Sequence, residues 1–168
     1  SVKNIPSDEN YVLYALHFEP EATIMNRTRF NSQIYNIEIL SQAIPPGWLI
    51  YVKEHPDQLN IRFLIKNKFI DDNLSSYRSD LYYKKILSLP NVKLLNHRIS
   101  SSKIMDSYIP TSSGDNCGLK AIATINGTIS IEAIHRKIPV MLFDALSMPY
   151  ADVVDVPCIN SYNDVIKY

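Results

Sequence analysis

The chain of 168 residues is 46% hydrophobic and 20% charged, a composition typical of a single folded globular domain. Its 17 basic and 17 acidic residues give a formal net charge of zero, which argues against a general binder of nucleic acids or anionic membranes. No apolar run reaches the roughly 18 residues that a membrane span requires, and residues 1–10 lack the apolar segment of a signal peptide.

The first part of the chain contains two strand patterns with a helix pattern between them. Residues 1–10 are polar, and we expect a linker or entry loop ahead of a single domain over 11–168. Continuous apolar runs rich in β-branched and aromatic residues predict strands, buried on both faces, at 11–17 and 48–53. Apolar residues at helical spacing predict an amphipathic helix over 29–43.

The second part continues this alternation after a long connection. About 20 residues follow the second strand, and a loop of that length is unusual in a compact domain, so we expect it to be functional or partly helical. In chain order we then expect a helix over 78–88, a strand over 92–95, a short helix over 103–108, a loop over 110–116, a strand over 119–125, a helix over 129–136, a strand over 139–143 and a last helix over 161–167.

Five buried strands that alternate with helices predict the α/β class, with right-handed crossovers and a doubly wound parallel sheet. We expect a Rossmann-like domain of about five to six strands, in the order 3-2-1-4-5. The strand order then reverses between the first and fourth strands, and ligands bind outside the carboxyl ends of the strands at this switch point. Functional side chains are therefore expected directly after the predicted strands.

The segment after the fourth predicted strand suits a phosphate group. A strand that turns through Gly127 into a helix presents free backbone N–H groups and the positive end of the helix dipole, and Thr128 and Ser130 add hydroxyl donors. The alternative is an ordinary helix start, with Asn126 as the capping residue. In the following helix, Glu132 would be costly to bury without a partner, so it is a candidate for contacts with ribose hydroxyls or for a salt bridge.

Charged and polar residues also follow the second and first predicted strands. His55, before Pro56, can donate to a phosphate or stay neutral and ready for proton transfer. Lys53 and Glu54 point to opposite faces by strand alternation, so we expect one to support the site and the other to face a helix. The alternative is a solvated turn.

After the first strand, Glu19 and Glu21 flank Pro20. Paired carboxylates in different environments can do acid and base work, and the proline between them fixes the backbone. The alternative is two solvated acidic residues in a loop. The four histidines share no metal-ligand spacing, so we expect no metal site.

Several of these segments combine into a more specific pattern. They are His17–Thr23, Tyr51–Pro56, Leu89–Leu95, Thr124–Ala133 and Pro139–Phe143. In this order and spacing they resemble the capsule polysaccharide biosynthesis family, which comprises bacterial surface-carbohydrate glycosyltransferases of the two-domain GT-B type, related to CMP-ketodeoxyoctulosonate transferases. The resemblance implies the C-terminal, nucleotide-sugar-binding half of such an enzyme. The sequence departs from the family pattern at Glu19, where we expect glutamine, and at Asp144, where we expect glycine.

The resemblance also implies roles for individual residues. Lys53 and Asn126 are expected among the residues that bind the substrate. His55 and Pro56 would hold the phosphate and cytidine side of the donor, and Gly127, Thr128 and Ser130 would contact its phosphate. Glu132 would approach the ribose or the sugar. Glu21 matches the family's Pro-Glu pair and is the candidate for the chemical step or for substrate positioning.

The implied partners are a nucleotide sugar, which is a substrate and not a cofactor, and a saccharide acceptor held by a missing N-terminal domain. With two cysteines that form no disulfide framework, we expect a cytoplasmic protein, peripherally associated with the inner face of the cytoplasmic membrane, with no nucleic-acid partner. Two other functions fit the same fold. One is a sugar-nucleotide epimerase or polyol-phosphate transferase domain, and the other is a non-catalytic nucleotide-binding or assembly module.

Overall fold

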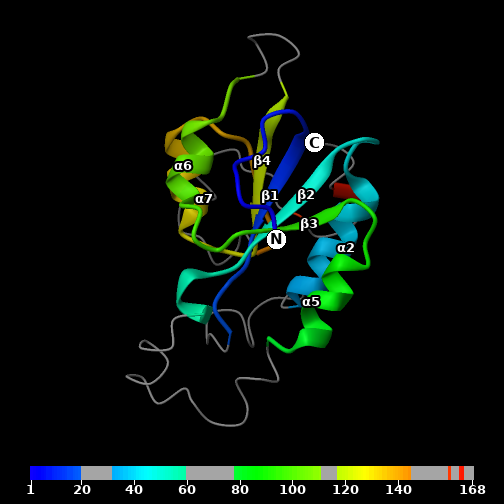
Figure 1. Ribbon diagram of the computed structural model, residues 1–168. Helices are drawn as coiled ribbons and strands as arrows, with labels where there is room; N and C mark the ends of the chain where they lie inside the picture. The colour runs from blue at the N-terminus through cyan, green and yellow to red at the C-terminus, as the bar shows by residue number, and fades with distance from the viewer. Residues whose placement is uncertain (20–31, 60–77, 111–116, 145–158, 160–162, 165–168) are drawn as a thin grey trace.

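The computed structural model describes residues 1–19, 32–59, 78–110, 117–144, 159 and 163–164. In these ranges five parallel strands form one sheet in the order β3-β2-β1-β4-β5 (Figure 1). The α/β class, the parallel pairing and the strand order are therefore confirmed. The strands are β1 (Asn10–Ala15), β2 (Leu49–Lys53), β3 (Val92–Leu95), β4 (Gly118–Thr124) and β5 (Val140–Leu142).

Helices cover both faces of the sheet (Figure 1). They are α2 (Gln33–Ala43), α5 (Asp80–Leu87), α6 (Ser101–Asp106) and α7 (Ile129–His135), and the 3-10 turn η1 (Pro56–Leu59) follows β2 beyond the end of the sheet. Two core clusters, one on each face, result from this arrangement. Ile37 of α2 and Ile86 of α5 belong to one cluster, and Ile104 of α6 and Ala133 of α7 belong to the other.

The strand β1 explains why the sheet needs cover on both sides. Val12 and Tyr14 belong to the α2 and α5 cluster, whereas Tyr11 and Leu13 belong to the α6 and α7 cluster, as the alternation of side chains in a strand requires. All four side chains are at most 1% exposed. Full burial of a large apolar side chain contributes about 1.5–3 kcal/mol, so two-sided packing is the main source of stability here.

Most predicted element boundaries differ from the observed ones by one to four residues. The helix predicted over 29–43 is described from Gln33, where the Ser32 side chain accepts a hydrogen bond from the backbone N–H of Tyr35. The helix predicted over 103–108 begins earlier, at Ser101, because Ser100 takes the N-cap position. Of the helix predicted over 161–167, the structure describes only residues 163–164, and the loop at 110–116 lies almost wholly outside the described residues.

The segment before β1 is attached to the free edge of the sheet. Val2 forms a parallel bridge with Leu95, in which the Val2 N–H donates to the Leu94 carbonyl at 2.8 Å and the Asn96 N–H donates to the Val2 carbonyl at 2.9 Å. The expected entry loop therefore contributes one residue to the outer edge of β3. None of the helices in the described ranges has the length and apolar character needed to cross a membrane.

Candidate functional site

The segments that leave β1 and β2 meet at the carboxyl edge of the sheet, where Ala15 and Lys53 are register partners. One side chain, Arg78, holds the two segments together. Its guanidinium forms ion pairs with Glu19, which follows β1, and with Glu54, which follows β2 at 2.9 Å. It also donates to the His17 carbonyl at 2.7 Å. Arg78 thus cross-links two adjacent strand tips.

This ion-pair network is shielded from solvent. The exposed fractions of the side chains are 5% for Arg78, 6% for Glu54 and 16% for Glu19. The guanidinium stacks over the ring of Tyr82, 4.6 Å from its centroid. Burial by itself lowers the pKa of Arg78, but Tyr82 and the two carboxylates outweigh that effect and raise it, so the guanidinium stays charged.

The carboxylate of Glu54 has three donors and is fixed in place. Besides Arg78, the Tyr83 hydroxyl donates to it at 2.6 Å and the backbone N–H of His55 at 2.8 Å. Burial, followed by this hydrogen bond to a carboxylate, raises the pKa of Tyr83, so its hydroxyl remains a donor. A carboxylate with several donors orients the next residue, and here that residue is His55.

The half-buried ring of His55 has a defined hydrogen-bonding pattern. Its Nδ1 accepts the backbone N–H of Asp57 at 3.2 Å, in the turn η1 that Pro56 begins. A neutral ring that accepts at Nδ1 carries its proton on Nε2. The ring of Phe18 contacts it edge-on, with centroids 6.1 Å apart. His55 is therefore oriented as an Nε2–H donor when it is neutral.

Two buried glutamines complete the connection between the segments. Gln33 of α2 accepts the His17 N–H at 2.7 Å and donates to the Glu19 carboxylate at 2.8 Å. Gln58 of η1 accepts the Glu19 N–H at 2.8 Å and donates to the Glu19 carbonyl at 3.0 Å. The backbone leaving β1 is thus held from both sides.

Lys53 and Glu54 are both buried, with exposed fractions of 4% and 6%. The Lys53 ammonium donates to the Glu54 carbonyl at 3.4 Å. Burial lowers the pKa of Lys53, although the neighbouring Glu54 carboxylate partly offsets that effect. Glu54 contacts Arg78 and the backbone N–H of His55, and the roles predicted for Lys53 and Glu54 at the substrate stay predictions.

The turn after β4 approaches the segment after β1. The Nε2 atom of His17 lies 3.1 Å from the Thr124 hydroxyl and accepts the backbone N–H of Asn126 at 3.3 Å. A Cβ atom at Gly127 would lie 2.8 Å from the Thr124 hydroxyl oxygen and 3.5 Å from Nε2 of His17. The short contact with Thr124, in the same turn, disfavours a side chain at 127 whether or not a ligand binds there, whereas the distance to His17 is an ordinary van der Waals contact.

The other residues predicted in this turn occupy different environments. Thr128, and not Asn126, takes the N-cap position of α7, and its side chain makes no capping bond. Ser130 is fully buried, and its hydroxyl donates to the Gly127 carbonyl. Glu132 is exposed, so the expected burial cost does not arise. Arg136, one turn further along α7, forms an ion pair with Asp106. Their predicted ligand contacts stay predictions.

The structure thus brings His55 and Pro56 close to the segment after β1, and His17 links that segment to the turn at Gly127. Glu21 lies outside the described residues. Sequence reasoning missed Arg78, which has no recognisable local pattern, and Gln33. A signal for Gln33 was present, because it shares a helical face with the buried Ile37 and Leu40. Among the described residues, no three or more His, Cys, Asp or Glu side chains are grouped as a metal site would require.

Comparisons with known proteins add one finding. No family model and no curated protein matches the sequence. A solved structure, the KpsC protein of Thermosulfurimonas dismutans, a beta Kdo 2,7 transferase, matches with a TM-score of 0.55 and 12% sequence identity. The match covers 97% of this chain and 46% of that chain, so this chain spans about half the length of KpsC. At this identity the likeness concerns the fold, and the chain has a Rossmann-like α/β fold of the kind found in that glycosyltransferase.

Proposed function

We propose that this chain is the donor-binding part of a glycosyltransferase that acts in the synthesis of a capsule or another surface polysaccharide. The observation that carries the proposal is the convergence of three strand tips, after β1, β2 and β4, at the switch point of a sheet whose fold matches that of a sugar transferase. Ligands bind at such switch points. The donor we propose is a CMP-activated sugar.

The geometry suggests how His55 would take part. Glu54 holds its backbone N–H, and the Asp57 N–H at Nδ1 leaves the proton of the neutral ring on Nε2. An imidazole held in this way can donate to the phosphate of a nucleotide sugar as the bond between the anomeric carbon and the phosphate oxygen breaks. Stabilising the charge of the leaving nucleotide would be its contribution to transfer.

The remaining parts of the proposal concern residues and partners around this centre. Lys53, Pro56, Asn126, Gly127, Thr128 and Ser130 would surround the nucleotide, and Glu132 would approach the ribose or sugar. Glu21 would act in the chemical step or position the substrate. A second domain of a GT-B enzyme would hold the saccharide acceptor, and the enzyme would work in the cytoplasm at the inner face of the membrane.

A calorimetric titration with CMP, CDP and UDP tests the proposal. Wild type should prefer CMP, and His55→Ala should weaken CMP binding by about 1–3 kcal/mol, the scale of a lost charged hydrogen bond. Glu132→Ala should weaken it on the same scale if the ribose contact exists. The control is His135→Ala, an exposed histidine at the end of α7, which should leave CMP affinity unchanged.

The other outcomes would contradict specific parts of the proposal. A preference for UDP or CDP would overturn the CMP-sugar donor and favour an epimerase or polyol-phosphate transferase. Binding of none of the three nucleotides would overturn the donor-binding role of this chain. Equal losses of CMP affinity in His55→Ala and His135→Ala would show that the effect of His55→Ala is not specific to the proposed donor site.

A further inference from the structure

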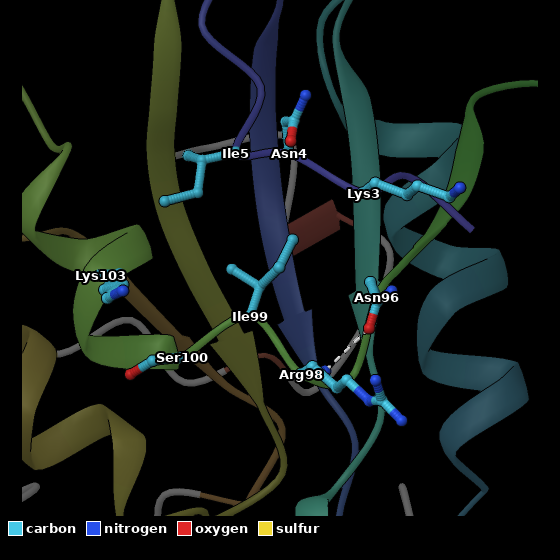
Figure 2. Close-up of a pocket in the computed structure, with 8 residues that line it drawn as sticks. All are labelled: Lys3, Asn4, Ile5, Asn96, Arg98, Ile99, Ser100 and Lys103. Carbon is cyan, nitrogen blue, oxygen red and sulfur yellow. Dashed lines mark hydrogen bonds between the residues drawn. The ribbon is translucent and has the colours of Figure 1, made fainter.

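A pocket of about 510 Å³ lies apart from the site described above (Figure 2). Its walls are the segment before β1, the turn that follows β3 and the first half of α6. None of its lining residues belongs to the site described above, which is built from the segments after β1, β2 and β4. Its volume falls within the range of about 300–1,000 Å³ that small-molecule sites occupy.

The charge of the pocket is one-sided. Lys3, Arg98 and Lys103 line it, and no acidic residue does. All three are exposed, and in the described part of the chain none of the three forms an ion pair, whereas Lys85, Lys93, Arg78 and Arg136 all do. A hollow lined by charges of a single sign concentrates ligands of the opposite sign.

The walls of the pocket are held by backbone hydrogen bonds. The bridge of Val2 to β3 fixes the segment that carries Lys3. In the turn after β3, the Asn96 carbonyl accepts the Ile99 N–H at 3.0 Å, and the Asn96 side chain accepts the Arg98 N–H at 2.9 Å. These bonds shape the pocket before any ligand arrives, which lowers the entropy cost of binding.

The lining also has an apolar floor. Ile5 and Ile99 line the pocket and pack against the core cluster on the α6 and α7 side of the sheet. In Figure 2, Ile99 lies between Lys103 on one side and Lys3 and Arg98 on the other. The three cations are therefore spread around the floor. Positive charge on both sides of the floor fits a ligand with more than one anionic group better than one small ion.

We propose that this pocket binds a sugar-sized polyanion, a small molecule that carries two or more phosphate groups on a compact body. Lys103 and Arg98 would contact separate phosphates, and Asn4 and Ser100 would add polar contacts. The Ser100 side chain makes no capping bond with α6. The proposal does not depend on a nucleotide binding at the switch point.

Fructose bisphosphate is a suitable probe, with neutral fructose as its control. In a calorimetric titration of the full chain, the bisphosphate should bind, fructose should not, and added salt should weaken binding because the charges are exposed. The double variant Arg98→Gln/Lys103→Gln should weaken binding at least about tenfold, the effect of losing one charge-assisted hydrogen bond. Lys84→Gln removes one exposed positive charge from α5 and should change the affinity by less than about twofold.

Four results would overturn the proposal. The first is no binding of the bisphosphate at low salt. The second is a loss of affinity in Lys84→Gln that equals, for each charge removed, the loss in Arg98→Gln/Lys103→Gln. That result would indicate general attraction of the bisphosphate to the positive charges of the surface. The third is binding to anionic lipid vesicles without binding to the soluble bisphosphate. Competition by CMP would also overturn it, because the two ligands would then share one site, so failure here is distinguishable from failure of the donor site.

Discussion

The Nε2 atom of His17 accepts the backbone N–H of Asn126 at 3.3 Å. This bond joins the segment after β1 to the turn after β4, across the point where the strand order reverses. The same nitrogen lies 3.1 Å from the hydroxyl of Thr124. A buried imidazole thus links the two strand tips beside which we place the donor.

Replacing His17 by alanine should loosen this link between the two strand tips. The Asn126 N–H would lose its acceptor, and the space beside Gly127 would open, so we expect a loss of stability of about 1–3 kcal/mol. Hydrogen exchange of the Asn126 amide should accelerate more than that of amides in β3. The variant His97→Ala, at an exposed position after β3, is the control. Unchanged exchange at Asn126 in His17→Ala would contradict the role assigned to this bond.

The variant Arg78→Gln should be strongly destabilised. It leaves the Glu54 and Glu19 carboxylates buried without their cation, and breaking a buried ion pair typically costs about 3–5 kcal/mol. Arg136→Gln breaks the exposed pair with Asp106 and should cost less than about 1 kcal/mol. Urea unfolding of both variants measures the difference. Similar costs would show that burial does not distinguish the two pairs.

Gly127→Ala should be destabilising because its Cβ atom would lie 2.8 Å from the Thr124 hydroxyl oxygen. Overpacking of this kind typically costs about 1–3 kcal/mol. Combining it with Thr124→Ala removes the atom that clashes, so the double variant should lose less than the sum of the two single losses. A double-mutant cycle in urea tests this. Additive losses would mean that the turn shifts away from Thr124 instead.

Lys53 should make the free energy of unfolding depend on pH. Because burial lowers its pKa in the folded state, the unfolded chain binds more protons on this residue between the lowered pKa and the ordinary value of 10.5. The free energy of unfolding therefore gains a term that rises as pH increases through that range. Lys53→Met should be more stable than wild type at neutral pH, and its advantage should shrink as pH rises.

Urea unfolding at several pH values from neutral upward measures this effect. The control Lys84→Met changes an exposed lysine of α5, and its stability curve should run parallel to the wild-type curve. A parallel curve for Lys53→Met as well would contradict the assignment. Only the difference between each variant and wild type is informative, because buried tyrosines also titrate at high pH.

The sequence predicted the sheet well for a physical reason. A strand covered by helices on both faces must be apolar on both faces. The continuous apolar runs around Tyr51 and Ile122 therefore indicate buried strands of a parallel sheet. Connections between parallel strands are right-handed crossovers, which leaves few possible strand orders. The ends of the helices were less predictable. Several neighbouring serines could each have been the N-cap of α6, and the sequence does not show that Ser100 takes that position.

The site was predicted less completely. His55, Pro56 and Gly127 follow strands, so their position at the carboxyl edge could be inferred from topology. Arg78 could not, because its role depends on contacts with residues far away in the sequence. Glu132 was expected in an apolar setting because its neighbours in sequence are apolar, but it lies on the exposed side of α7.

The bridge between Val2 and Leu95 has a consequence for the order of folding. It is a single bridge at the outer edge of the sheet, and pairing of β1 with β2 and of β2 with β3 first shortens the loop that the bridge must close. The sheet can assemble from β1 to β5 before this bridge forms. Docking of Val2 onto the outer edge of β3 would then be a final step, and the cationic pocket would exist only in a chain that has completed it.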